Sequence, residues 1–138
     1  MKHRWVLLIT VCLLAIAWIF ASDKKGMAIH HLMRNEQIVT SHALSCMEEP
    51  DQTSRYQNWK TRYSAEYDVV RFQVSYTGFA SQTDALGFYY SPQDEPNGLG
   101  NTQGIEETDS GIKFLGEGDN YTLVEKISDH WYWYEMHW

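Results

Sequence analysis

The sequence has too few cysteines to be held together by disulfide bonds. It contains two, and Cys12 lies inside a hydrophobic run while Cys46 lies beyond it. A single thiol outside the run argues against the disulfide-rich class of small secreted proteins. The remaining residues, about 115, must therefore fold around an ordinary hydrophobic core, for which that length is sufficient.

Basic residues are also scarce after the hydrophobic run. All 18 acidic residues lie after Ser22, together with only 9 of the 11 basic residues, so this part of the chain carries a net charge of −9. Nucleic acids and anionic lipids are bound through Lys and Arg side chains that contact phosphates. The sequence therefore predicts no nucleic-acid partner.

The common catalytic and nucleotide-binding motifs are missing. The chain has no Gly-x-Ser-x-Gly motif, no phosphate-binding glycine loop and no dinucleotide fingerprint. Carboxylates are plentiful, but no local pattern selects a pair for acid–base hydrolysis. We therefore predict no catalytic residue and no cofactor, and we expect a binding protein rather than an enzyme.

The one long hydrophobic run lies at the N-terminus. It extends from Trp5 to Ala21 and follows Lys2 and Arg4. Its 17 residues would rise roughly 25 Å as a helix, near the lower limit for crossing a bilayer. We expect a single-pass membrane anchor at 1–22, a linker at 23–27 and a domain on the extracytoplasmic side. The alternative is a cleaved signal peptide and a secreted domain.

Residues 28–47 have the periodicity of an amphipathic helix. The apolar positions recur at spacings of three and four: Ile29, Leu32, Met33, Val39, Ala43, Cys46 and Met47. Because Cys46 belongs to this stripe, we predict a buried, unpaired thiol. His42 lies one turn earlier on the same face, so a metal site or an activated thiol is the alternative.

Alternation with a period of two begins at residue 67. It predicts five strands, at 67–76, 86–91, 112–115, 121–127 and 131–137, with a long loop at 92–104. Residues 51–66 fit either a short helix or an ordered loop, and they form the only locally basic stretch of the domain. The predicted fold over 28–138 is α+β, with one amphipathic helix packed on a mostly antiparallel sheet of about five strands.

Neither the histidines nor the acidic loops form a recognisable site. His130 and His137 are seven residues apart on one predicted strand, so their side chains face opposite sides. The acidic segments 94–98 and 106–111 contain oxygen ligands that calcium accepts, but they lack the EF-hand spacing. We therefore interpret these side chains as solvated and predict no metal site.

Aromatic residues dominate the C-terminal segment 131–138. Alternation places Trp131 and Trp133 on one face, and it places Tyr132, Tyr134, Met136 and Trp138 on the other. Because this composition favours strands, we predict a paired strand and not a free tail. Burial of both faces is the commoner outcome, whereas exposure of one face would create an aromatic platform for sugars, peptides or a partner protein.

These features lead to two functional hypotheses. The first is a membrane-tethered, extracytoplasmic, non-catalytic binding or interaction module for an envelope glycan, a peptide or a membrane protein. Its candidate binding residues are Trp131, Trp133, Trp59 and Tyr63. The alternative is a small cell-envelope hydrolase that uses carboxylates of the acidic loops. Convergent Asp or Glu side chains in a pocket would favour the enzyme, and an exposed aromatic face would favour binding.

Overall fold

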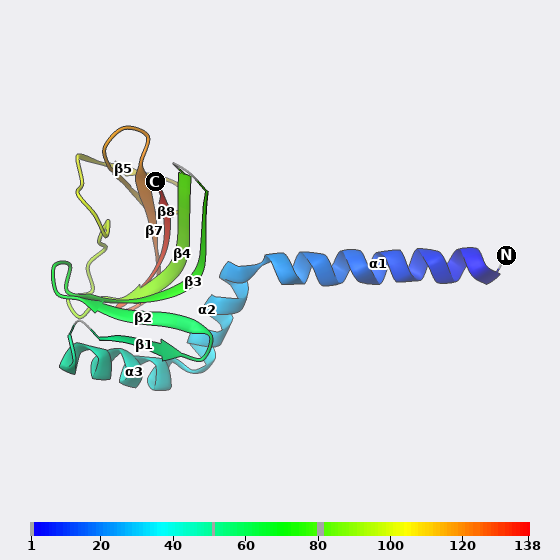
Figure 1. Cartoon of the computed structure of the whole chain (residues 1–138), viewed down its shortest axis with the longest axis horizontal. Helices are drawn as coiled ribbons and strands as arrows, with labels where there is room; N and C mark the ends of the chain where they lie inside the picture. Colours follow the sequence, from blue (N-terminus) through cyan, green and yellow to red (C-terminus); the bar gives the residue numbers. More distant parts are fainter. Residues whose placement is uncertain (1, 51, 80–81) are drawn as a thin grey trace.

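The computed structural model describes residues 2–50, 52–79 and 82–138. Within these residues, three helices precede eight strands (Figure 1). The helices are α1 (Lys2–Ser22), α2 (Lys24–Arg34) and α3 (Glu36–Glu48). The strands are β1 (Thr53–Tyr56), β2 (Trp59–Ser64), β3 (Val69–Phe79), β4 (Gln82–Tyr90), β5 (Gly104–Glu107), β6 (Ile112–Leu115), β7 (Tyr121–Ser128) and β8 (Trp131–His137).

Helix α1 extends away from the rest of the molecule (Figure 1). The prediction of a membrane anchor at 1–22 is wrong, because no helix in the described part of the chain is both long and apolar enough to cross a membrane. The apolar run has 17 residues, at the lower limit of the lengths that cross a bilayer core. The single-pass topology and the extracytoplasmic location rested on that anchor, so neither is supported.

The predicted helix over 28–47 is in fact two helices, separated at Asn35. The side-chain amide of Asn35 donates to the carbonyl oxygen of His31 at 2.9 Å, and its backbone φ of −126° departs from helical geometry. The chain therefore turns before α3 begins. The buried residues of the two helices are Ala28 and Leu32 in α2, and Val39, Ala43 and Cys46 in α3.

The eight strands form an antiparallel sheet in the order β1-β2-β3-β4-β8-β7-β6-β5. The α+β fold with five strands and one amphipathic helix is therefore wrong in its number of elements. The additional strands are β1 and β2, which lie in the ambiguous stretch 51–66, and β5, which follows the predicted loop. The prediction that the C-terminal segment is a paired strand is confirmed, because β8 pairs with both β4 and β7.

Helices α2 and α3 cover one face of the sheet, on the outside of its bend (Figure 1). The core beneath them is rich in aromatic rings. Phe72 and Phe88 stack with their ring centroids 4.8 Å apart, and Trp131 and Trp133 are almost fully buried beside them. We call this the helix-covered face.

The opposite face, which we call the open face, lies on the inside of the bend and carries a second core. Its buried members are Val69, Tyr89, Leu99, Val124, Tyr132, Tyr134 and Met136. The connection between β4 and β5 passes along this side (Figure 1), and it contributes Leu99. Leu99 has a φ of +57°, which costs an L-residue about 1–2 kcal/mol. Burial of its side chain, which is 3 % exposed, offsets that cost.

Candidate functional site

The four residues predicted to bind a ligand belong to the helix-covered face. Trp131 and Trp133 are 1 % and 0 % exposed. Trp59 is partly buried, and its ring centroid lies 5.1 Å from that of Phe88. The hydroxyl of Tyr63 donates to Asp68 at 2.9 Å. The structure thus brings the four together around the core beneath the helices, and their binding role stays a prediction.

The open face has an exposed aromatic residue of its own, Trp138. It continues the β8 row of Tyr132, Tyr134 and Met136, which are all buried, but Trp138 itself is 53 % exposed. Its backbone is fixed to β4, because Trp138 N donates to Thr83 O at 2.9 Å and Thr83 N donates to Trp138 O at 2.7 Å. Trp138 is therefore an exposed indole on an ordered backbone.

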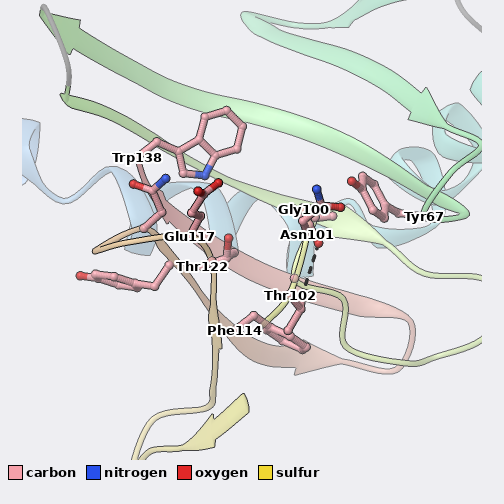
Figure 2. A pocket seen from close by; sticks show the side chains of 13 residues that line it. Tyr67, Gly100, Asn101, Thr102, Phe114, Glu117, Thr122 and Trp138 are labelled. Carbon is pink, nitrogen blue, oxygen red and sulfur yellow. Dashed lines mark hydrogen bonds between the residues drawn. The ribbon is translucent and has the colours of Figure 1, made fainter. Parts of the chain in front are cut away.

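Trp138 borders a first cleft of about 320 Å³, which we call the amide cleft. Figure 2 shows Trp138 and Tyr67 at opposite ends, with Asn101 and Thr102 from the β4–β5 connection between them. Other side chains in the lining come from β6, β7 and the turn between them: Phe114, Glu117, Asn120, Tyr121 and Thr122. Aromatic rings with a few amides and hydroxyls are typical of ligand sites.

Hydrogen bonds hold the wall of the amide cleft in place. The backbone N–H of Asn97 donates to the Tyr89 hydroxyl at 2.7 Å, and the backbone N–H of Leu99 donates to Asn97 Oδ1 at 2.8 Å. Burial raises the pKa of Tyr89, which keeps this hydroxyl protonated at neutral pH. Gly98 lies so close to Phe114 that a Cβ would come within 2.7 Å of it. The cleft wall therefore depends on a glycine here.

A second cleft, of about 200 Å³, adjoins the other side of Trp138, and we call it the cationic cleft. Its charged lining consists of Lys60 and Arg62 from β2 and Arg71 from β3, and none of its lining residues is acidic. The neutral lining residues are Gln73, Tyr76, Thr83, Ala85, Tyr134, Met136 and Trp138.

A third cleft, of about 600 Å³, is acidic. It is lined by Gln82, Asp84, Glu117, Gly118, Asp119, Asn120, His137 and Trp138. Trp138 therefore borders clefts of opposite charge.

The three cations of the cationic cleft and the neighbouring Arg55 are paired with one another across the strands, so they repel. Arg62 is the direct partner of Arg71 in the β2–β3 register, and Arg55 is the direct partner of Lys60 in the β1–β2 register. Like charges directly opposite each other destabilise a sheet. In the described part of the chain, no carboxylate forms an ion pair with any of these four side chains.

Tyr134 forms part of the floor of the cationic cleft. Burial raises the pKa of Tyr134 to about 12, although the nearby Arg71 charge acts in the opposite direction. The hydroxyl lies over Gly87, where a Cβ would approach it to 2.8 Å and would also collide with the carbonyl oxygen of Phe72. Gly87 is therefore required for Tyr134 to occupy this position.

The Cys46–His42 pair lies on the other side of the sheet. The predicted burial of the unpaired thiol is confirmed, because Cys46 is a free cysteine and is 8 % exposed. Its Sγ lies 3.5 Å from His42 Nε2 and 3.3 Å from Ser54 Oγ, and the same His42 atom lies 3.0 Å from Thr61 Oγ1. Burial lowers the pKa of His42. This hydrogen-bonded network links α3 to the β1–β2 hairpin.

Two carboxylates of the acidic region, Asp94 and Asp84, contact distant parts of the chain. Asp94 accepts hydrogen bonds from Lys126 Nζ at 2.8 Å, from the backbone N–H of His130 at 2.7 Å and from the Tyr132 hydroxyl at 3.0 Å. These contacts lower the pKa of Asp94 to about 2, with Lys126 contributing most. His137 Nδ1 lies 2.7 Å from a carboxylate oxygen of Asp84. Among the residues that the structure describes, no three His, Cys, Asp or Glu side chains are placed to hold a metal ion.

No family model, curated protein or solved structure matches this chain significantly. The function must therefore be argued from the geometry of the clefts. Sequence reasoning did not select Trp138 or the three cations of the cationic cleft. The available signals were the basic character of 51–66 and the alternation that separates Trp138 from Trp133.

Proposed function

We propose that the protein is a non-catalytic binding module whose ligand is a glycan lying across Trp138 on the open face. The observation that carries this proposal is that Trp138, half-exposed on an ordered backbone, borders three clefts. A flat indole offers the apolar face of a sugar ring a large, rigid contact surface. Side chains on both sides of it can then bind the sugar hydroxyls.

The polar groups around Trp138 suit this ligand. Asn101 and Asn120 in the amide cleft, and Gln73 in the cationic cleft, each present a group that can both donate and accept hydrogen bonds. Sugar hydroxyls also do both. A stable protein interface would bury about 800 Å² on each partner around an apolar centre. The open face instead offers small clefts around Trp138, with further aromatic side chains such as Tyr76 in their walls, which favours a glycan over a protein partner.

One observation favours the hydrolase alternative, namely that Asp84, Glu117 and Asp119 line the acidic cleft together. Its candidate carboxylates lie in the acidic loops, and Asp94 is held there by three donors. With its pKa lowered to about 2, Asp94 stays ionised and cannot act as a general acid near neutral pH. Asp84 contacts His137 instead of a second carboxylate.

A glycan array probed with the full chain tests the proposal. We expect selective retention that Trp138→Ala abolishes and that Trp18→Ala, which removes an exposed tryptophan from α1, leaves unchanged. Equal retention by the Trp138→Ala variant would contradict the proposed site. Prolonged incubation should leave the mass of a bound oligosaccharide unchanged, and its shortening would show that the protein is an enzyme.

A further inference from the structure

We infer that the glycan is acidic, with a carboxylate bound in the cationic cleft by Arg62, Arg71 and Lys60. This inference rests on the proposed function and specifies its ligand. Four independent features of the open face support it, namely the distribution of charge, the cross-strand repulsion, the free hydroxyl of Tyr134 and the contrast between the clefts.

The distribution of charge in the domain is uneven. The chain after Ser22 has twice as many acidic as basic residues, yet four of its nine basic residues belong to β1, β2 and β3. The register pairs Arg55 with Lys60 and Arg62 with Arg71, and it pairs Thr61 with Phe72 of the helix-covered core between them. Because successive side chains point to opposite faces, these four cations share the open face. Such clustering in an acidic domain produces a local positive potential.

The cross-strand pairing of Arg62 with Arg71 has a cost that the protein alone does not offset. No ion pair within the described residues neutralises either guanidinium. An anion between them would convert this repulsion into two attractive contacts. A carboxylate suits the site, because the planar donors of arginine match its two oxygens.

The hydroxyl of Tyr134 provides a further donor. The residue is 2 % exposed, and within the described part of the chain its hydroxyl has no hydrogen-bond partner. Tyr134 lines the cationic cleft, so its hydroxyl is placed to contact a ligand bound there. Since its pKa lies near 12, the hydroxyl keeps its proton and can donate it to an anion.

The other two clefts determine the orientation of the ligand. Glu117 borders both the amide cleft and the acidic cleft, so a carboxylate placed there would be repelled. The cationic cleft, at about 200 Å³, is smaller than a site for a drug-sized molecule and suits a single sugar unit. We therefore place the acidic unit in the cationic cleft, the stacked ring on Trp138, and a neutral unit in the amide cleft.

Calorimetric titration of the full chain with trigalacturonate and with its methyl ester tests this inference. The two ligands differ in charge, and a non-ionic detergent shields the exposed apolar side chains of α1. We expect the ester to bind at least about tenfold more weakly, since charged hydrogen bonds contribute that much or more. Arg62→Gln should weaken trigalacturonate binding about tenfold and leave binding of the ester unchanged. Arg34→Gln, which makes the same charge change at an exposed position of α2, should affect neither.

The charge-reversal variant Arg62→Glu tests whether a loss of binding is caused by unfolding. Arg62→Glu places a carboxylate opposite Arg71, so the variant should keep or raise its melting temperature while losing trigalacturonate binding. If Arg62→Glu loses both its fold and its binding, the variants Arg62→Gln and Lys60→Gln provide the test of the inference instead. If neither glutamine variant weakens trigalacturonate binding relative to Arg34→Gln, the inference is wrong.

The remaining outcomes separate the inference from the proposed function. If trigalacturonate and its ester bind equally and Trp138→Ala abolishes the binding of each, the proposed glycan-binding function stands and the acidic ligand is overturned. If neither compound binds and the array shows no retention, the proposed function and the inference are overturned together. Triglutamate binding as tightly as trigalacturonate, with the same dependence on Arg62, would identify an acidic peptide and overturn the glycan assignment.

Discussion

Trp133 and Trp138 lie five residues apart at the end of the same chain and play different parts on the two faces of the sheet. Trp133 points beneath the helices and is completely buried, whereas Trp138 points to the open face and is half-exposed. Helices α2 and α3 cover the first position, whereas the second borders three clefts and no helix covers it. Residue type alone therefore does not determine whether a tryptophan is buried, because its burial depends on whether another layer covers that face of the sheet.

The polar groups of the two faces differ in the same way. On the helix-covered face, the Trp133 indole N–H donates to Glu135 at 2.9 Å, and Lys25 pairs with Glu125 at 2.7 Å. On the open face, Arg62 and Arg71 lie opposite each other without a carboxylate in the described part of the chain. Satisfied polar groups are what stability requires. Unsatisfied charges that repel each other indicate a role in binding.

The largest expected difference between the faces is in the cost of removing a tryptophan. Trp133→Ala should lower the free energy of unfolding by about 3–5 kcal/mol, because it leaves a large cavity beneath the helices. Trp138→Ala should lower it by no more than about 1 kcal/mol, since the ring is half in solvent. Urea denaturation measures both values. A similar decrease in the free energy of unfolding for the two variants would contradict the difference in burial between the two faces.

A smaller effect is expected at Leu99, which fills the open face from a loop. Leu99→Ala should cost about 2–4 kcal/mol. Replacing a buried leucine by glycine usually lowers the free energy of unfolding more than replacing it by alanine. Because the φ of +57° at this position favours glycine, Leu99→Gly should be no less stable than Leu99→Ala. Thermal melts of the two variants make the comparison. A clearly less stable Leu99→Gly variant would contradict the left-handed conformation at this site.

Lowering the pH should reduce the free energy of unfolding in two separate pH ranges, one set by a residue on each face of the sheet. His42, in α3, has a lowered pKa, so its contribution is complete above its unfolded pKa of about 6.5 and decreases as the pH falls below that value. Asp94, beside Tyr132, contributes fully above about 3.8 and loses its contribution as the pH falls toward about 2. Urea unfolding as a function of pH should show both ranges. His42→Gln should flatten the upper range and Asp94→Asn the lower; unchanged pH profiles would contradict the assignments.

The smallest predicted effect is a gain in stability. Arg62→Glu should raise the free energy of unfolding by about 0.2–1 kcal/mol, because a repulsive cross-strand pair becomes attractive. Arg34→Glu, on an exposed helix position, serves as the control for the change in net charge. High salt should reduce the gain. A destabilised Arg62→Glu variant in low salt would show that the two arginines are not opposed as described.

Alternation predicted the C-terminal half of the sheet well. It separated the two faces of β8 correctly, because successive side chains of a strand point to opposite faces of the sheet, and this does not depend on which strands pair with it. It failed at β1 and β2, where Tyr56 and Trp59 have helical spacing although they pair across a two-residue turn. That turn consists of Gln57, which has a φ of +54°, and Asn58; asparagine is typical of turns but glutamine is not.

The candidate site was less predictable than the fold. The cationic cleft combines residues of β2, β3, β4 and β8, and β8 lies next to β4 only because it is inserted out of sequence order. The pairing of Arg62 with Arg71 depends on a register that the hydrophobic pattern of β3 alone does not determine. The length of the N-terminal apolar run, at the lower limit for a membrane span, gave too weak a basis for an anchor.

The most direct test of the contrast between the faces is paramagnetic broadening of amide resonances in the isotopically labelled full chain. An anionic nitroxide and a neutral nitroxide of similar size are compared at equal concentration. We expect the amides of Lys60, Arg62 and Arg71 to broaden more with the anionic probe, while the indole N–H of Trp133, which is buried beneath the helices, broadens with neither. Equal broadening of the cleft amides by both probes would contradict an accessible cationic cleft on the open face.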